Sequence, residues 1–313
     1  MSLPADDTFQ SSSVAHLEIY SCSLCGSSSH RELYPQTISG GSTISPDDFN
    51  CTNPGHGEHF RIVSCNDCGM VYCSPRPAPE ALAMLYGEGE DPTYVHEQDG
   101  RVRTFDASLD RMGAISGSLL DIGCQTGIFM DRAQRRGMDV YGLEPSSYAT
   151  KLAQQAGRKV ICGVAPCSLP WGKKFDVITL WDVIEHVHDP LEILKFCFDN
   201  LNPGGQLHLS TMYLDSWYVR LVGRKWPWFM RMHIQYFTRK SITQALTAVG
   251  FTDIRIRAHK HIVHRGYLLQ KLAKLSWPLR LVGRLGAWFL ADRDGYIPVS
   301  MGDMMHVCGV RKA

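Results

Sequence analysis

From Ser118 onward, short apolar segments alternate with longer segments of helical length. Several of the longer segments stop at a glycine, as helices often do. The run Phe175–Leu180 is almost continuously apolar, which is typical of a strand buried on both faces of a parallel sheet. We therefore expect an α/β fold with a seven-stranded, mostly parallel sheet and helices on both faces. The predicted strands are 119–122, 139–143, 159–162, 175–180, 206–211, 251–257 and 304–311, and the predicted helices are 128–136, 147–156, 191–201 and 238–249.

A glycine turn, DIGCQTG at Asp121–Gly127, joins the first of these strands to its helix. Glycine lets the backbone turn tightly and lets a ligand approach it closely, and the helix N-terminus adds unpaired N–H groups. A dinucleotide site would need glycine at positions 125 and 128, where Gln125 and Ile128 stand. The pyrophosphate-binding form of the motif is therefore excluded, and the acidic residue favours a ligand with a cationic end.

Glu144 ends the second predicted strand, about 20 residues beyond the glycine turn. A carboxylate at this position can accept hydrogen bonds from both hydroxyls of a ribose. The alternative is that Glu144 caps the helix that follows. Together with the glycine turn, the position favours the ribose role.

Five strings in this order and spacing resemble the class I S-adenosylmethionine-dependent methyltransferases, from about Leu119 to Arg311. The resemblance implies a Rossmann-like fold and S-adenosylmethionine as cofactor. The family usually has glycine where Gln125 stands, and often aspartate near position 164 or 165. The strings are DIGCQTG (121–127), GLEPS (142–146), FDVITLWDVIEHVHDP (175–190), LNPGG (201–205) and HIQYFT (233–238).

The same resemblance implies which residues contact the cofactor. The first motif wraps the methionine part, the acidic residue after the second strand holds the ribose, and residues after the third and fourth strands line the rest of the pocket. The implied residues are Asp121, Gly123, Cys124, Gln125 and Gly127, then Glu144 and Pro145, then Gly163 and Val164, and finally Trp181 and Asp182.

Methyl transfer needs alignment and, for a weakly nucleophilic acceptor, a base. Histidine suits that role near neutral pH. In the resembling family, the positions of His186 and His233 tend to lie near the acceptor, and we place Tyr236 with them as catalytic candidates. Alternatively, either histidine is structural, or Glu185, His186 and His188 bind a metal ion.

Two Cys-x-x-Cys knuckles, each followed by glycine, lie near the N-terminus. Four thiolates in a tetrahedron suit Zn²⁺, and such a site stabilises a unit with a small apolar core. We expect Cys22, Cys25, Cys65 and Cys68 to bind a structural zinc ion in a zinc-ribbon-like module. Because the two pairs are far apart, the stretch between them must loop out, and Cys51, His56, His59 and Cys73 are alternative ligands.

Composition shifts divide the chain into four parts. Residues 75–79 contain three prolines, which mark a boundary. Two segments interrupt the strand–helix alternation where such sheets often carry substrate-binding elements. The predicted parts are a lead-in at 1–20, the zinc-binding Cys module at 21–78, a helical linker or lid at 79–117, and the methyltransferase domain at 118–313 with insertions near 213–236 and 259–302.

The first insertion is basic and rich in aromatic residues, including Trp226, Trp228 and Arg231. Aromatic rings stack on sugars or bases and arginine pairs with phosphate, although a packing role is an equal alternative. We therefore expect a small-molecule or glycoconjugate acceptor, with a sugar, nucleotide-linked or lipid-linked group. The other two hypotheses are RNA methylation and a non-catalytic protein with a degenerate cofactor site.

Net charge +1 and an acidic Cys module make nucleic acid an unexpected partner. Residues 267–290 mix apolar residues with lysine and arginine, which predicts either peripheral membrane contact or a cover for the sheet. No apolar run is long enough for a spanning helix, and no secretory signal is seen. With eleven cysteines, this favours a reducing, cytoplasmic location.

Overall fold

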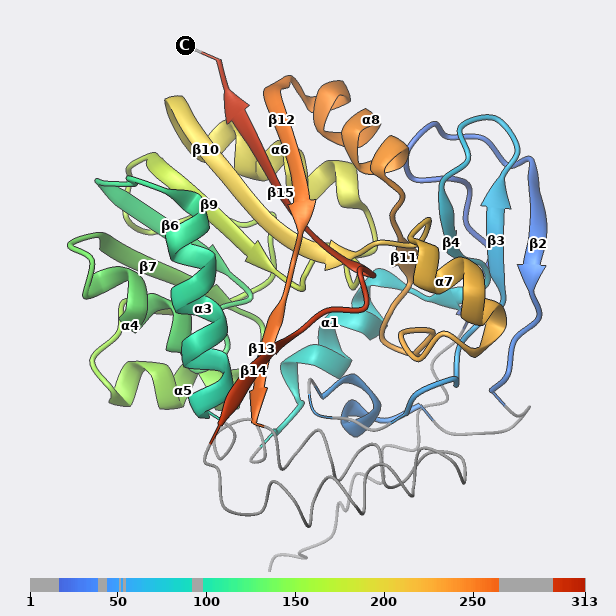
Figure 1. Cartoon of the computed structure of the whole chain (residues 1–313), viewed down its shortest axis with the longest axis horizontal. Helices are drawn as coiled ribbons and strands as arrows, with labels where there is room; N and C mark the ends of the chain where they lie inside the picture. Colours follow the sequence, from blue (N-terminus) through green and yellow to red (C-terminus); the bar gives the residue numbers. More distant parts are fainter. Residues whose placement is uncertain are drawn as a thin grey trace, which may run out of the picture.

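A computed structural model describes residues 17–38, 44–50, 52, 55–91, 98–264 and 295–312 (Figure 1). The larger sheet has seven strands in the order β12-β15-β10-β9-β6-β7-β8. Pairing is parallel from β10 to β8, while β15 is antiparallel to both of its neighbours. The predicted mostly parallel sheet is therefore confirmed. Its strands are β6 (Ser118–Ile122), β7 (Asp139–Glu144), β8 (Val160–Cys162), β9 (Phe175–Trp181), β10 (Leu201–Met212), β12 (Phe251–Ala258) and β15 (Met304–Arg311).

Helices cover both faces of this sheet, as predicted. On one face, Leu109 and Phe129 pack against strand residues such as Leu119 in one apolar cluster. On the other, Ile193 and Leu246 belong to a second cluster. Burial of these side chains removes apolar surface from water and fixes the helices on the sheet. The helices are α3 (Gln98–Met112), α4 (Ile128–Gln134) and α5 (Ser147–Gln155), then α6 (Pro190–Asn200) and α8 (Arg239–Val249).

Most of the predicted helix ends agree with the structure. Thr238 caps α8 through its side chain, and Gly250 ends that helix in the left-handed conformation. Helix α6 begins one residue earlier than predicted, because Asp189 caps it and Pro190 takes its first position. The segment 203–205, which falls between the predicted helix 191–201 and the predicted strand 206–211, lies within β10, where the pairing with β9 shifts register.

A second sheet holds the Cys module and has four strands, in the order β11-β4-β3-β2. Its edge strand comes from the first insertion, because Gln235 pairs with Tyr72 and Tyr236 pairs with Val71. The predicted module at 21–78 is therefore completed by a distant part of the chain. The strands are β2 (His30–Tyr34), β3 (Ile62–Cys65), β4 (Val71–Cys73) and β11 (Gln235–Tyr236).

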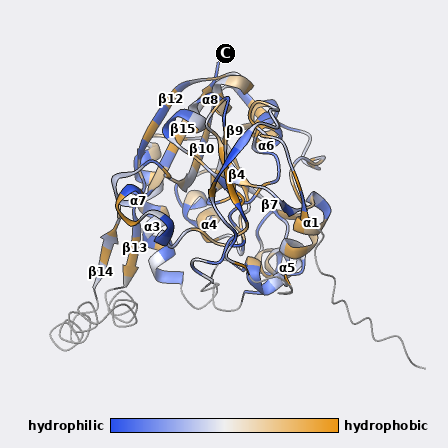
Figure 2. Ribbon diagram, turned by 90° about the vertical axis from the view of Figure 1, so that its right-hand side faces the viewer, coloured by the Kyte–Doolittle hydropathy of each residue, from blue (hydrophilic) through white to orange (hydrophobic). Residues whose placement is uncertain are grey.

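The core beneath this second sheet joins both parts of the chain. Phe60 and Val71 of the Cys module pack with Leu82 and Leu85 of α1 and with the fully buried Trp226 of the insertion. Figure 2 shows α1 as largely hydrophobic and α3 as more hydrophilic. The neighbouring elements are α1 (Pro79–Gly87), α7 (Trp217–Val222), and the short 3-10 helices at Pro46–Phe49 and Gly223–Lys225.

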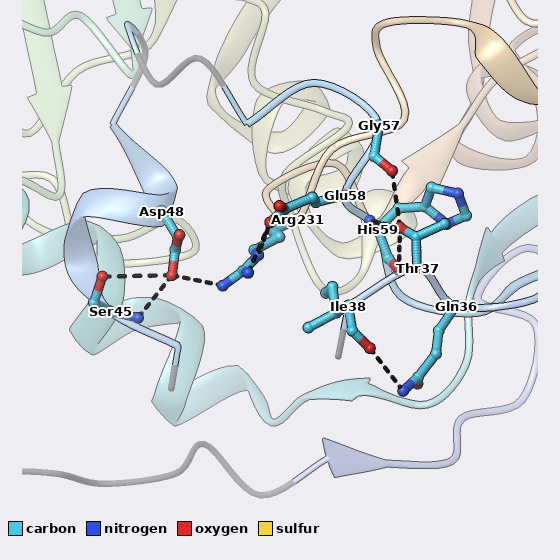
Figure 3. A network of polar contacts seen from close by, with 9 residues as sticks. All are labelled: Gln36, Thr37, Ile38, Ser45, Asp48, Gly57, Glu58, His59 and Arg231. Carbon is cyan, nitrogen blue, oxygen red and sulfur yellow. Dashed lines mark hydrogen bonds and ion pairs between the residues drawn. The ribbon is translucent and has the colours of Figure 1, made fainter. Parts of the chain in front are cut away.

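Arg231 ties the insertion to the loop between the two Cys pairs (Figure 3). Its guanidinium lies 3.1 Å from Asp48 and 2.7 Å from Glu58. In the same loop, the Thr37 hydroxyl donates to the Gly57 carbonyl at 2.8 Å. Arg231 is therefore engaged by two carboxylates, which for this residue favours the packing alternative over pairing with an acceptor phosphate.

Three smaller features complete the fold. Strand β1 (Leu17–Glu18) pairs with β5 (Arg76–Pro77), and β13 (His261–His264) pairs with β14 (Tyr296–Val299). The predicted membrane-contact segment at 267–290 lies outside the described residues. Among the residues that are described, no helix has the length and apolar character needed to cross a bilayer.

Candidate functional site

The glycine turn lies at the carboxyl end of β6, beside the ends of its parallel neighbours β7 and β9. Gly123 and Gly127 have φ values of 72° and 90°, and Gln125 also adopts a left-handed conformation with φ 51°. A side chain at Gly123 would clash with Val183, so the turn needs glycine there. The turn thus forms as predicted, and Gln125 adopts a conformation that glycine takes most easily.

Both carboxylate oxygens of Glu144 accept hydrogen bonds from backbone N–H groups. One oxygen accepts from the Gln125 N–H at 2.8 Å, and the other accepts from the Ser146 N–H at 2.9 Å. Burial raises the pKa of Glu144 to about 7, although the two N–H groups favour the ionised form. Ser146, and not Glu144, caps α5 through the Ala149 N–H, so the capping alternative is wrong.

Asp121 is buried and accepts a hydrogen bond from the Thr179 hydroxyl at 2.6 Å. Burial raises its pKa to about 7, and the charge of Glu144 adds to that rise. Two buried carboxyl groups therefore face this edge of the sheet without a lysine or arginine partner among their hydrogen bonds. A positively charged ligand would favour the ionised form of both.

Asp182 follows β9 and also has a left-handed backbone, with φ 54°. Its carboxylate accepts from the Ser210 hydroxyl at 2.6 Å, while its own N–H contacts the same hydroxyl at 3.0 Å. Trp181 beside it packs on Phe129, with ring centroids 5.2 Å apart. Non-glycine residues in this conformation occur often at functional sites, and both Gln125 and Asp182 lie at the predicted cofactor edge.

The remaining predicted cofactor residues surround the ends of β6, β7 and β8. Cys124 is buried, and burial raises the pKa of its thiol well above the usual value, so it stays protonated. The Gly163 N–H donates to the Glu144 carbonyl at 3.0 Å. The next residue, Val164, is 50% exposed, which leaves an apolar surface available to a flat ring. Pro145 follows Glu144, and its carbonyl lies 3.5 Å from the Cys162 thiol.

Beyond β9, the two predicted histidines lie together. The rings of His186 and His233 are 4.9 Å apart between centroids. One ligand atom from each of Glu185, His186 and His233 falls within a 4.8 Å spread. The alternative metal set named His188, but the structure brings His233 into this cluster instead. His188 packs against Tyr20, with ring centroids 4.3 Å apart.

Backbone carbonyls orient both rings. Nδ1 of His233 lies 2.7 Å from the Trp228 carbonyl, and Nδ1 of His186 lies 3.0 Å from the Met232 carbonyl. A carbonyl only accepts, so each Nδ1 carries the proton and Nε2 is the basic nitrogen of each neutral ring. The backbone of Asp182 also contacts the His186 ring. Burial lowers the pKa of His186, and it lowers that of His233 to about 3, so both rings are neutral at pH 7.

Tyr86 of α1 completes this cluster and was missed by the sequence analysis. Its hydroxyl lies 2.8 Å from Nδ1 of His186 and donates to the Met232 carbonyl at 3.3 Å. The available signal was only the position of Tyr86 in the predicted linker or lid. Helix α1 therefore contacts His186 at the same ring nitrogen as the Met232 carbonyl and helps to orient the ring.

Tyr236 does not join the histidines. It is fully buried in β11 and packs on Trp226 and Phe229, with ring centroids 6.3 Å and 5.2 Å away. Burial raises the pKa of its phenol well above the usual value. Such a side chain cannot reach an acceptor, so the catalytic expectation for Tyr236 is replaced by a packing role.

The four knuckle cysteines meet at one point. Cys22 and Cys68 have their Sγ atoms 3.5 Å apart, as do Cys25 and Cys65, and all four lie within 4.8 Å of one another. Tetrahedral zinc with Zn–S bonds of about 2.3 Å would place its thiolates about 3.8 Å apart. The geometry therefore fits a single zinc ion held by four thiolates.

The glycine after each knuckle takes the left-handed turn that was expected, with φ 75° at Gly26 and 79° at Gly69. Two of the alternative ligands lie elsewhere. His59 contacts the Phe60 carbonyl at 2.7 Å, and Cys73 lies 3.6 Å from the His233 carbonyl. Cys51 is outside the described residues. The ligand set named from the knuckles therefore needs no exchange.

The aromatic residues of the first insertion serve mainly as packing. The indole N–H groups of Trp226 and Trp228 both donate to Asp303, at 2.9 Å and 3.1 Å. Trp217, by contrast, is 64% exposed, and Leu221 one turn later is 75% exposed. Only the α7 part of the insertion therefore presents an aromatic surface outward.

A parallel sheet whose carboxyl edge carries a glycine turn and two buried carboxyl groups is typical of cofactor-binding methyltransferases. Residues 94–256 match the family model described as methyltransferase domain, which covers more than half of the chain. The chain belongs to the class I S-adenosylmethionine-dependent methyltransferases, and it is an enzyme of that class.

Individual members of this class share limited sequence identity with the chain. The chain is 31% identical to an Escherichia coli ubiquinone biosynthesis O-methyltransferase over 168 residues, which cover 50% of this chain and 70% of the relative. The corresponding enzyme of Idiomarina loihiensis is 25% identical over 173 residues, covering 51% and 71%. A chain from the complex between the Haloferax volcanii Trm112 methyltransferase activator and a methyltransferase has a similar fold, with TM-score 0.51, 17% identity, and coverage of 72% and 99%.

Proposed function

We propose that this enzyme transfers the methyl group of S-adenosylmethionine to a hydroxyl oxygen of a small-molecule or glycoconjugate acceptor. The observation that carries the proposal is the pair of neutral histidines beside Asp182, each with its Nδ1 held by a backbone carbonyl. An oxygen acceptor needs such a base, because a hydroxyl is a weak nucleophile until it loses its proton. The O-methyltransferase names of the relatives agree with this choice.

S-adenosylmethionine supplies a methyl group on a positively charged sulfur. In our proposal, Glu144 accepts hydrogen bonds from the ribose through the remaining lone pairs of its carboxylate. Asp121 stabilises the positively charged end of S-adenosylmethionine. Gly163 and Val164 flank the adenine. Trp181 and Asp182 line the pocket, together with the turn formed by Gly123, Cys124, Gln125 and Gly127. These contributions are alignment and electrostatic complementarity.

His186 is our choice as the base, and His233 as its neighbour that binds the acceptor. The proton of the acceptor hydroxyl passes to Nε2 of His186, while Nδ1 stays bonded to Met232 and Tyr86. The charge of Asp182, whose pKa is lowered, raises the pKa of His186 against the effect of burial and so stabilises the imidazolium that forms. This arrangement lets a ring with a lowered pKa hold a proton briefly.

The test has two stages. Calorimetry should show micromolar-range binding of S-adenosylmethionine and S-adenosylhomocysteine to the zinc-loaded chain. A screen of phenolic, sugar and lipid-linked acceptors should then give an O-methyl product, identified by mass spectrometry and NMR. His186→Gln should lower kcat about 100-fold or more while cofactor affinity stays unchanged. A product methylated on nitrogen or carbon would contradict the oxygen assignment.

We further propose that Cys22, Cys25, Cys65 and Cys68 hold one structural zinc ion. The spacing of the four Sγ atoms supports this, and the closed set leaves no position for a substrate. The domain boundaries are also a proposal: 21–78 with β11 as the zinc-binding unit, 79–117 as linker and lid, and 118–313 as the methyltransferase domain.

Peripheral membrane contact remains part of the proposal for a lipid-linked acceptor. The exposed Trp217 and Leu221 of α7 adjoin the exposed Arg220, Arg224 and Lys225. Apolar side chains beside basic ones suit an anionic lipid surface. RNA methylation is a less favoured alternative, since Arg231, a basic residue of the insertion, is engaged by carboxylates. A salt-sensitive RNA shift would be needed to support it.

A further inference from the structure

We propose that Arg111, Arg255 and Arg257 form a binding site for a phosphate-type oxyanion, separate from the methyl-transfer site. All three line one surface pocket on the α3 side of the large sheet. No carboxylate lines this pocket. Its other lining residues are Met112, His208, His306 and Cys308.

The sheet register explains why these residues meet. Arg255 lies opposite Cys308, and Arg257 lies opposite His306, in the antiparallel pairing of β12 with β15. Residues two apart on a strand share a face, so both arginines point to the same side. The last turn of α3 brings Arg111 onto this face. Two distant parts of the chain therefore place three guanidinium groups around one space.

These three charges lack counter-charges. Within the part of the chain that the structure describes, none of them forms an ion pair. Nη1 of Arg111 is buried without a hydrogen-bond partner. Among the described residues, Arg255 donates to the Cys308 thiol at 3.7 Å, which is a weak acceptor. Guanidinium donors in such surroundings are available to an anion.

The two histidines that line the pocket are engaged with neighbouring side chains, so the arginines are the donors available to an anion. Nδ1 of His208 lies 3.1 Å from Nε2 of His306, and Nε2 of His208 lies 3.0 Å from the Gln206 amide oxygen. Burial, together with the charges of Arg111 and Arg257, lowers the pKa of His306 to about 4. The same arginines that hold His306 neutral create a positive field at the pocket.

A phosphate-type group matches this arrangement best. Arginine presents a planar fork of N–H donors that bonds two oxygens of a phosphate at once, and a polyvalent anion offers oxygens to several forks. The pocket borders the predicted cofactor region, since the His306 ring lies 5.5 Å from Trp181. The anion is therefore either a free phosphate or pyrophosphate, or the phosphate of a larger acceptor molecule.

The test is calorimetric titration of the full chain with pyrophosphate at fixed ionic strength. We expect one site per chain, weakened at least about tenfold in Arg255→Gln/Arg257→Gln and in Arg111→Gln. Arg111→Lys, which keeps the charge, should recover part of the affinity. The control is Arg31→Gln/Arg135→Gln, which removes two exposed arginines elsewhere and should match the wild type.

Circular dichroism and zinc content would show that each variant is folded. Equal pyrophosphate affinity in the wild type and the double variant, or an equal loss in the control, would overturn the site. Uridine diphosphate glucose separates the two sources. Binding that is tighter than that of pyrophosphate and lost in the same variants indicates the phosphate of an acceptor. Binding no tighter than that of pyrophosphate indicates a site for the free anion.

Discussion

Gln125 holds a left-handed backbone conformation that costs most side chains about 1–2 kcal/mol relative to glycine. Its N–H bonds to Glu144 at 2.8 Å, so the strained residue also fixes the carboxylate expected to hold the ribose. The family pattern predicted glycine at this position. The structure shows that Gln125 can meet the same backbone requirement, and the sequence alone did not reveal whether it would.

Gln125→Gly should therefore raise the free energy of unfolding by up to about 1 kcal/mol, because it relieves the left-handed strain. Affinity for S-adenosylmethionine should change less than about threefold. Chemical denaturation and calorimetry would measure these values. Gln134→Gly in α4 is the control, where the same substitution should destabilise by about 1 kcal/mol. Destabilisation by Gln125→Gly would show that the side chain of Gln125 contributes contacts that the backbone argument omits.

Glu144→Gln should weaken S-adenosylmethionine binding at least about tenfold, because the amide cannot accept from the Gln125 N–H, the Ser146 N–H and a ribose together. The substitution preserves size, so the fold should persist. Glu192→Gln, on the exposed face of α6, is the matched control. Wild-type affinity in the Glu144 variant would remove the ribose assignment.

The pKa of Glu144 predicts a pH dependence. Burial raises that pKa to about 7, so below this value the carboxyl is largely protonated in the free enzyme. Cofactor affinity should then increase as pH rises from 6 to 8, and Glu144→Gln should make the curve less steep, leaving the contribution of Asp121, whose pKa is also about 7. An acid whose pKa is raised on folding also lowers stability as pH rises from about 4.5 to 7. Affinity that falls over pH 6 to 8 would contradict the ionised ribose contact.

At the scale of elements, β11 couples the Cys module to the candidate active site. The Cys73 N–H donates to the Ile234 carbonyl at 2.9 Å, and the Ile234 and Gln235 N–H groups both donate to the Glu185 carbonyl at 3.0 Å. His233 lies two residues before this strand. Its position therefore depends on an edge of the sheet that the zinc ion would stabilise.

Removal of zinc should lower activity as well as stability. The variant Cys22→Ser/Cys25→Ser should lose stoichiometric zinc, measured by mass spectrometry of the metal, and should lower the melting temperature. Its kcat should fall more than its cofactor affinity, because His233 shifts while the glycine turn stays in place. Cys162→Ser, an exposed cysteine outside the cluster, is the control. Full activity in a folded, zinc-free variant would refute this coupling.

At the scale of the whole molecule, local patterns predicted most of the large sheet. Strand periodicity, caps and the glycine turn act within a few residues, so a sequence reveals them. Contacts between distant segments determine the rest. They bring His233 and not His188 to the histidine cluster, bury Tyr236 and pair β11 with β4. Cys73 and His233, for example, are 160 positions apart. No local pattern specifies which distant edge a two-residue strand will join.

A shortened chain tests this long-range organisation. A chain that begins at Pro79 lacks β3 and β4 and leaves β11 without its pairing partner. Its apolar surface around Trp226 and Phe229 would also lose contacts with Phe60 and Val71. We expect this chain to aggregate or to lose more than 90% of its activity. A soluble, active product would show that the Cys module is dispensable.

The shared edge at β11 has a further consequence for how such enzymes diversify. A zinc module that ends at residue 78 would be a cassette, exchangeable between methyltransferases by joining genes at one boundary. Here the Cys module would be split, since one strand of its sheet lies in the insertion near 213–236. An exchange between two enzymes with this arrangement would therefore have to transfer both stretches of sequence together.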